Sequence, residues 1–304
     1  MKLITILGPT AVGKTSVAVA VAKRIQGEII SADSRQIYRH MSIGTAQPDE
    51  QQRQTVRFHC IDFVDPGVSY SCGQFARDAE DKISDVIARH RIPIICGGTG
   101  LYIKALFDPL HPLPESDPGI KCELIRRLQK EGLETLYKRL QDIDPEWAQK
   151  IDPHDKQRIL RGLEVYEMTN TPLSVLTTDQ KRSPRYEPVY IGLHLPRNEL
   201  NQKIDRRVDD MIEQDLVCEV QTLLQMHFDP ACNALRTIGY REIIAYLNGA
   251  ISLHTAIAQV KQHTRQYAKR QCTWFRRLPG VQWHDPGDKN LVTYLAHYVQ
   301  EANS

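Results

Sequence analysis

The segment that most constrains the fold is Gly8–Thr15, which reads GPTAVGKT and lies close to the N-terminus. It follows the apolar run Leu3–Leu7 and precedes Ser16–Ala22, a stretch that can start a helix. A strand, a glycine-rich loop ending in Lys-Thr and a helix, in this order, define a P-loop. In that geometry the loop amides and the helix N-terminus point at phosphate oxygens, Lys14 adds a charge, and the Thr15 hydroxyl can hold Mg²⁺. The predicted ligand is therefore a diphosphate or triphosphate, bound by Gly8, Pro9, Thr10, Ala11, Val12, Gly13, Lys14 and Thr15.

Strands and helices alternate along the N-terminal part of the chain. We expect strands at 2–7, 28–32, 61–64 and 92–96, helices at 14–24, 71–91 and from 101, and an irregular segment at 41–57. This alternation predicts the α/β class, with a doubly wound parallel sheet around the P-loop. Ligands of such sheets bind at the carboxyl ends of the strands. Asp33 and Thr99 each follow a predicted strand, so we expect both beside the P-loop.

The pattern changes after residue 110, where prolines interrupt it. From Ile120 to Glu167 the chain reads as helices, and 171–188 reads as a proline-containing loop. Tyr190–Leu195 then looks like a strand that returns to the sheet. We therefore predict a P-loop core formed by 1–112 and 188–304, with 113–187 as a helical insertion that acts as a lid. The C-terminal part is expected to be helical apart from a short segment at Val281–Trp283.

Composition excludes several classes of protein. Lys and Arg number 39 against 37 Asp and Glu, which is an ordinary balance for a soluble chain. No apolar run has the length of a membrane span and the N-terminus lacks a signal-peptide pattern, so we expect a cytoplasmic protein with no membrane contact. Seven cysteines contain no Cys-x-x-Cys pair and eleven histidines show no ligand spacing. Reduced thiols and the absence of a zinc site are therefore predicted.

Basic residues gather near the C-terminus. Between Arg236 and Arg277 there are eight Lys or Arg and one acid, Glu242. Such an excess favours a polyanionic partner, while a solvated helix face is the alternative. At roughly 100° per residue, one side of the helix is basic and the other is predicted to be core. The basic side holds Lys261, Arg265, Lys269 and Arg276, and the core side holds Ile257, Val260, Tyr267, Trp274 and Leu278.

Asp33 is the first candidate for chemistry beyond phosphate binding. In many P-loop kinases an Asp at this strand end serves Mg²⁺ or the acceptor hydroxyl. The alternative is that Asp33 only caps a helix or closes a turn. The strand before Gly97 lacks the terminal Asp of a Walker B motif, which disfavours a motor-type ATPase or a GTPase.

Several further segments occur in an order that resembles one known family over nearly the whole chain. That family is the bacterial tRNA dimethylallyltransferases, also called tRNA isopentenyltransferases. This chain lacks the Cys/His pairs that form the C-terminal zinc finger of eukaryotic relatives, and we expect a bacterial source for that reason. The matching segments, besides the P-loop, are Ile30–Tyr38, Ile43–Ala46, Gly97–Tyr102, Asp155–Glu164, Gly239–Arg241 and Ala268–Arg276.

The resemblance implies a reaction. The P-loop would hold the diphosphate of dimethylallyl diphosphate with Mg²⁺, and Asp33 would accept the proton of the N6 amine of the adenosine 3′ of the anticodon. Thr99 would lie near the reaction centre and Arg207 beside the diphosphate. On local grounds each has an alternative: Thr99 can cap a helix, and Arg207 can pair with Asp205 or Asp209 on its own helix.

The resemblance also implies contacts with the anticodon stem-loop of tRNA, whose adenosine must leave its stack to react. We expect a monomer, although the sequence does not decide whether the chain dimerises. The residues predicted to contact tRNA are Asp33, Ser34, Arg35, Gln36, Lys121, Gln157, Arg158, Ile159, Leu160, Arg161, Arg236, Gly239, Tyr240, Arg241, Lys261, Arg265, Lys269 and Arg276.

Two other functions remain open at this point. A P-loop kinase acting on a small molecule or nucleotide would also use Asp33, although it would leave the basic helix and the insertion unexplained. A non-catalytic, GTPase-like nucleic-acid-binding module is disfavoured because the chain lacks both Walker B and a guanine-reading Asn-Lys-x-Asp run.

Overall fold

The computed structural model describes residues 2–108, 113–177 and 185–303, with side chains described through 299. The chain divides into two compact units, one formed by 1–108 and 184–304 and the other by 109–183. The boundaries 112/113 and 187/188 of the insertion, and its action as a lid, stay predictions. Each unit is described by itself below.

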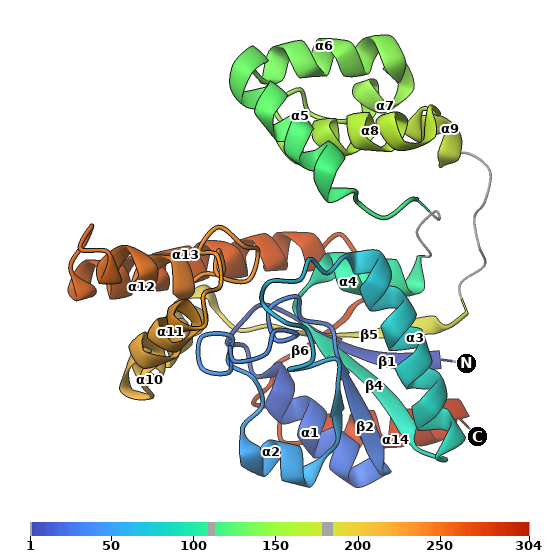
Figure 1. Cartoon of the computed structure of the whole chain (residues 1–304). Helices are drawn as coiled ribbons and strands as arrows, with labels where there is room; N and C mark the ends of the chain where they lie inside the picture. The colour runs from blue at the N-terminus through green and yellow to red at the C-terminus, as the bar shows by residue number, and fades with distance from the viewer. Residues whose placement is uncertain (1, 109–112, 178–184, 304) are drawn as a thin grey trace. The chain divides into compact units, whose positions relative to one another are not determined.

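The first unit is built on a parallel sheet. Its six strands in the described residues follow the order β3-β2-β4-β1-β5-β6, and every neighbouring pair is parallel (Figure 1). The predicted α/β class is confirmed. β1 and β4 occupy the centre because their residues are apolar on both faces, as buried parallel strands require. The strands are β1 (Lys2–Leu7), β2 (Gly27–Ser31), β3 (Phe58–His59), β4 (Ile92–Gly97), β5 (Glu187–Leu193) and β6 (Gln282–His284).

Helices cover both faces of this sheet. Ile4 and Ile6 of β1 pack with α1 and α14, whereas Leu3 and Leu7 point to the opposite face and pack with α3 and α4. This alternation of side chains along one strand produces two cores separated by the sheet. The helices of this unit are α1 (Lys14–Ile25), α2 (Glu50–Thr55), α3 (Cys72–Ala88), α4 (Gly100–Phe107), α10 (Arg197–Glu213), α11 (Leu216–Gln225), α12 (Tyr240–Leu247), α13 (Leu253–Phe275) and α14 (Leu291–Asn303).

Two local predictions were wrong. The segment 41–57, expected to be irregular, contains α2, which starts at a capping box between Asp49 and Gln52. The short strand lies at Phe58–His59 instead of 61–64, and Val64 makes only an isolated bridge with Tyr38. The apolar pattern at 61–64 is therefore core packing in a loop, and periodicity alone does not separate the two over so few residues.

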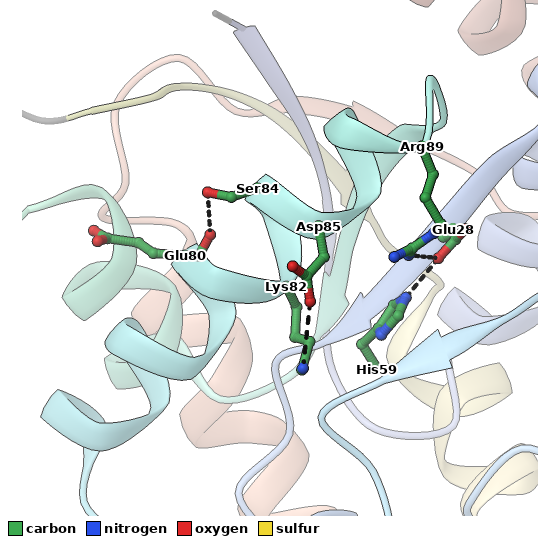
Figure 2. Close-up of polar contacts among 7 residues, drawn as sticks. All are labelled: Glu28, His59, Glu80, Lys82, Ser84, Asp85 and Arg89. Carbon is green, nitrogen blue, oxygen red and sulfur yellow. Dashed lines mark hydrogen bonds and ion pairs between the residues drawn. The ribbon is translucent and has the colours of Figure 1, made fainter.

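A cluster of polar side chains joins the edge of the sheet to the end of α3: Glu28 and His59 are buried, and Arg89 is exposed (Figure 2). Glu28 Oε2 accepts from Arg89 at 2.7 Å and lies 2.6 Å from His59 Nε2. Burial would raise the pKa of Glu28, but the hydrogen bonds from Arg89 and His59 outweigh it and lower that pKa. Burial also lowers the pKa of His59, opposed by the hydrogen bond and the charge of Glu28. The cluster ties β2, the edge strand β3 and the C-terminal end of α3 together.

The second unit is a small helical bundle around a leucine-rich core. Leu124, Leu136 and Leu140 are buried in it, and Gly162 lets α6 and α7 approach α8 closely. A Cβ at Gly162 would lie 2.8 Å from Leu140 and 3.0 Å from Trp147. Its helices are α5 (Pro118–Glu131), α6 (Leu133–Ile143), α7 (Pro145–Lys150), α8 (Lys156–Thr169) and α9 (Leu173–Leu176).

Candidate active site

The P-loop lies between the end of β1 and the first residue of α1, as its motif predicts. Gly8 and Gly13 have φ values of 150° and 107°, a region that favours glycine. A Cβ at Gly8 would also lie 2.7 Å from the carbonyl oxygen of Leu193 on β5. Lys14 Nζ donates to the Pro9 carbonyl at 2.8 Å, which holds the ammonium over the loop. Burial lowers the pKa of Lys14 to about 8, while nearby Cys96 and Asp33 oppose that shift.

Asp33 follows β2, two strands from the P-loop in the sheet order. Its Oδ1 accepts the Arg35 amide at 2.9 Å and the Gln36 amide at 3.4 Å, so the turn suggested as the alternative role does form. No hydrogen bond of its Oδ2 is seen within the described residues. One oxygen therefore shapes the turn, and the other is left for a ligand in the hollow that Asp33 lines with Lys14.

Thr99 follows β4, the strand between β1 and β2. It occupies the N-cap position of α4, but its side chain makes no capping hydrogen bond. Instead its Oγ1 accepts the Ser34 amide at 2.9 Å and lies 3.3 Å from the Ser34 hydroxyl. The capping alternative is thus not realised, and the Thr99 hydroxyl fixes the loop that carries Asp33.

Arg207 comes from α10. Arg207 does not form the salt bridge on its own helix that the sequence offered as an alternative. Both nearby carboxylates pair with α13 instead: Asp205 with Arg265 and Asp209 with Lys261, each at an N···O distance of 2.6 Å. Arg207 makes no ion pair with any residue that the structure describes, and it lines the same hollow as Lys14 and Asp33. Burial lowers its pKa, opposed by Asp33 and Asp210, yet guanidinium remains protonated in proteins.

Two hollows meet at these residues. The phosphate-side hollow, of about 310 Å³, is lined by the P-loop, Thr15, Ser31 and Asp210. The acceptor-side hollow, of about 320 Å³, is lined by the arginines 35, 236, 241 and 270 together with apolar residues such as Val208 and Val260. We call the two hollows together the passage. Their shared lining residues are Thr10, Lys14, Asp33, Thr45, Ala46, Arg207 and Met211.

Oxygen donors for a cation lie in the phosphate-side hollow. The Thr15 hydroxyl and the carboxylates of Asp33 and Asp210 all line it. In the described part of the chain no group of three or more His, Cys, Asp or Glu could hold a metal ion by itself. This donor set fits Mg²⁺, which is commonly held by one or two carboxylates together with substrate phosphates.

Sequence reasoning missed Gln271. It is buried on α13, accepts the Thr10 amide at 2.8 Å through Oε1 and donates through Nε2 to the Gly98 carbonyl at 2.8 Å. The side chain thus joins α13 to both the P-loop and the loop after β4. A signal was present, because Gln271 lies one turn from Tyr267 on the side of the helix assigned to the core, where a polar residue requires a partner.

Glu219 was missed as well. It accepts the amides of Ile43 at 2.8 Å and Gly44 at 3.0 Å, and the Tyr240 hydroxyl at 2.6 Å. Together these bonds hold the loop that places Thr45 and Ala46 in the wall of the passage. Nothing local in the sequence around Glu219 marks it for this role.

The residues predicted to contact RNA in the first unit fall into different places. Arg35, Arg236 and Arg241 line the acceptor-side hollow, and their contacts with tRNA stay predictions. Gln36 lines the phosphate-side hollow, where its amide donates to the Ala46 carbonyl at 2.8 Å. Tyr240 is 0% exposed, so its side chain cannot make the predicted contact with RNA in this conformation. Its neighbour Gly239 is also buried.

The basic side of α13 divides into two halves. Lys261 and Arg265 are ion-paired with Asp209 and Asp205 of α10. Lys269 and Arg276 are exposed and have no carboxylate partner among the described residues. The side of α13 that was predicted to lie in the core is buried only in part. Val260 on that side is 2% exposed, but Trp274 is 39% exposed.

In the second unit, Lys121, Gln157 and Arg158 are exposed, and Leu160 is partly buried. Arg161 pairs with Glu164 at 2.8 Å. Ile159 is 0% exposed in the core of the bundle, so the predicted RNA contact of its side chain is corrected. The segment 157–161 is a helical turn, which necessarily turns some of its side chains inward.

The fold and site define a P-loop protein of the α/β class, with a phosphate-binding loop beside a free carboxylate oxygen. A model of the IPP transferase family matches residues 36–278. The chain belongs to this family, and the resemblance found in the sequence is confirmed. No helix of the described residues is long and apolar enough to cross a membrane.

Individual relatives agree with this assignment. The tRNA dimethylallyltransferase of Carboxydothermus hydrogenoformans is 45% identical, with 99% of this chain and 97% of that protein covered. The full-length tRNA isopentenylpyrophosphate transferase of Bacillus halodurans has a TM-score of 0.72 at 36% identity, covering 99% and 96% of the two chains. A eukaryotic dimethylallyltransferase, solved acting on tRNA, has a TM-score of 0.82 at 29% identity, covering 99% and 77%.

Proposed function

We propose that the protein transfers the dimethylallyl group of dimethylallyl diphosphate to N6 of the adenosine 3′ of the anticodon in tRNA, releasing diphosphate. One observation carries the proposal: the P-loop and the free oxygen of Asp33 meet where a phosphate-side hollow joins an arginine-lined hollow. The names of the relatives supply the substrates, and this geometry provides a place for each of them.

The phosphate-side hollow suits departure of the leaving group. Negative charge grows on the bridging diphosphate oxygen as the allylic C–O bond breaks, and donors aimed at that charge lower the barrier. The P-loop amides, the Lys14 ammonium and the Arg207 guanidinium are the available donors. A bound Mg²⁺ held by Thr15 would supply further charge neutralisation.

The acceptor-side hollow suits the adenosine. Its base must leave the RNA stack to reach the passage, and Arg35, Arg236 and Arg241 can hold the flanking phosphates. As the N6 nitrogen bonds to the allylic carbon it becomes positively charged and must lose a proton. Asp33 Oδ2 accepts that proton, while Oδ1 keeps its turn hydrogen bonds and so holds the carboxylate in place.

Lys121, Gln157 and Arg158 of the second unit, with Leu160 and Arg161 beside them, are proposed to contact other parts of the tRNA. We also propose that the protein works as a monomer in the cytoplasm.

The decisive experiment incubates the protein with labelled dimethylallyl diphosphate, Mg²⁺ and unmodified tRNA. We expect label in tRNA and one diphosphate released for each prenyl group transferred, with no ATP consumed. When ATP and candidate small-molecule acceptors are also supplied, stoichiometric transfer of the ATP γ-phosphoryl group to an acceptor, with release of ADP, would instead establish the kinase alternative. A tRNA in which the target adenosine is replaced by guanosine is the matched substrate control.

A further inference from the structure

A shallow hollow of about 480 Å³ lies on the C-terminal half of α13. We call it the Trp274 platform. Only one of its residues, Lys269, belongs to the tRNA contacts expected from the sequence. The lining residues are Gln266, Lys269, Arg270, Thr273, Trp274 and Arg277.

The indole at its centre is both accessible and held in place. Trp274 is 39% exposed, although it is large and apolar. The edge of its ring that carries Nε1 lies against the backbone of Gly100, so close that a Cβ at Gly100 would overlap the indole. Gln271, one turn earlier, fixes the same stretch of helix to the Gly98 carbonyl at 2.8 Å. An aromatic ring that its own chain holds in place loses little rotamer entropy on binding a ligand.

The charges around the indole are all positive. Lys269, Arg270 and Arg277 are exposed and form no ion pair with any described residue. The earlier half of the same helix differs, because Lys261 and Arg265 are neutralised by carboxylates of α10. An exposed ring surrounded by unpaired cations is the arrangement by which proteins hold unpaired nucleotides, with a base on the ring and phosphates on the cations.

The platform adjoins the acceptor-side hollow. Arg270 lines both surfaces, and its guanidinium carbon lies 5.8 Å from the centre of the Tyr267 ring, which lines the acceptor-side hollow. A nucleotide on the platform would therefore be a near neighbour, along the RNA chain, of an adenosine in the passage.

We propose that an unpaired nucleotide flanking the reacting adenosine stacks on Trp274, with its phosphates bound by Lys269, Arg270 and Arg277. The proposal rests on the proposed function, since it takes the RNA in the passage as given. The stacked base explains why a large aromatic side chain is left in solvent between cations. Gln266 and Thr273 add polar groups at the edge of the platform.

The test measures tRNA affinity for W274A, W274F and a control, W283A. Trp283 on β6 is 37% exposed, nearly as much as Trp274, but lines neither the passage nor the platform. Loss of one base–aromatic stack should weaken tRNA binding about 5- to 140-fold in W274A. W274F should stay within about threefold of wild type because a ring remains, and W283A should bind normally. Dimethylallyl diphosphate affinity should be unchanged in all three.

A second measurement tests contact directly. 4-Thiouridine placed at each nucleotide flanking the target adenosine should cross-link, on irradiation, to the α13 segment that contains Trp274. Equal tRNA affinity of W274A and wild type, equal loss in W274A and W283A, or cross-links confined to other segments would each overturn the proposal. The proposal would also be overturned if a protein bound to the Trp274 platform while substitution of Trp274 left tRNA affinity unchanged. Failure of the wild type to form prenylated tRNA would instead refute the proposed function, whatever the Trp274 variants do.

Discussion

The basic side chains of this protein work in two different surroundings. Lys14 and Arg207 lie in the wall of the passage, where burial lowers the pKa of each. Lys269, Arg270 and Arg276 lie on the surface of α13, exposed to water and salt. A buried charge is screened little and has fixed neighbours, whereas an exposed charge is screened within about 10 Å at 0.1 M salt.

This difference separates two kinds of work. In the proposed reaction the buried cations act on charge that develops during bond breaking, so their removal should affect the chemical step. The exposed cations are proposed to contact RNA phosphates, which are the same before and after the reaction, so their removal should affect affinity alone. The variants below test that division.

Lys14→Ala should have the largest effect and abolish prenyl transfer, because the diphosphate loses the one ammonium that the P-loop holds over it. Activity is measured as label transferred to tRNA under single-turnover conditions. Lys23→Ala is the control, since Lys23 lies on the same helix, α1, but is exposed. Measurable transfer by Lys14→Ala at near wild-type rate would show that the buried ammonium is dispensable.

Asp33→Asn should lower the rate of transfer by about two to four orders of magnitude, the usual range for loss of a general base. The substitution is conservative here because an amide oxygen can still accept the Arg35 and Gln36 amides that Oδ1 accepts in the wild type. Binding of inorganic diphosphate, measured by competition, should survive. A variant that turns over normally would remove Asp33 from proton transfer and leave it only its role in the turn.

The double variant Lys269→Ala/Arg276→Ala should weaken tRNA binding and lower the log–log salt slope by about two, one for each phosphate contact removed. The matched control is Lys261→Ala/Arg265→Ala, on the same helix. Its cations already pair with Asp209 and Asp205, so its salt slope should stay close to that of wild type. Filter binding at several salt concentrations distinguishes the two, and equal slopes for both double variants would contradict the division of α13 into halves.

The smallest effect concerns pH. The pKa of Lys14 is lowered from 10.5 to about 8, chiefly by burial. Diphosphate binding requires the ammonium, so affinity should fall as pH rises through about 8, by up to tenfold for each pH unit.

The same lowering of the Lys14 pKa has the opposite effect on folding stability, which should rise with pH. Between pH 8 and 10.5 the unfolded chain holds the proton that the folded chain has lost, so this group makes the free energy of unfolding rise with pH.

Titration of the ligand itself also contributes to such a profile, so the measurement compares wild type with Lys14→Arg at each pH. The guanidinium keeps its charge throughout, and the ratio of the two affinities isolates the lysine. A ratio that does not change between pH 7 and 9.5 would show that the pKa of Lys14 lies outside this range.

Local pattern was enough to predict some parts of the molecule and not others. The P-loop, the strands that precede Asp33 and Thr99, and their convergence follow from periodicity and from the rule for parallel sheets. The partners of individual side chains do not. Asp205 and Asp209 lie near Arg207 in sequence, yet both pair across to α13 because the face of α10 that carries them packs there.

The same limit explains the missed residues and the corrected ones. Gln271 is far from Thr10 in sequence, so only the fold reveals that they bond. Tyr240 and Ile159 stand in segments rich in charge, and sequence composition could not show that these two side chains point into cores. Helical segments carry residues of both faces, and the choice between the faces is a matter of tertiary packing.

The hydrogen bonds of the P-loop have a consequence for the entropy of ligand capture. Lys14 donates to the Pro9 carbonyl and the Thr10 amide donates to Gln271, so the protein itself holds two groups of the loop. The glycines that give the loop its shape would leave it very mobile in isolation, because glycine has the most backbone freedom to lose. Here Gln271 of α13 restricts that freedom through its bond to the Thr10 amide, so part of the ordering of the loop belongs to folding. Binding free energy that would otherwise be used to order the loop remains available for the diphosphate.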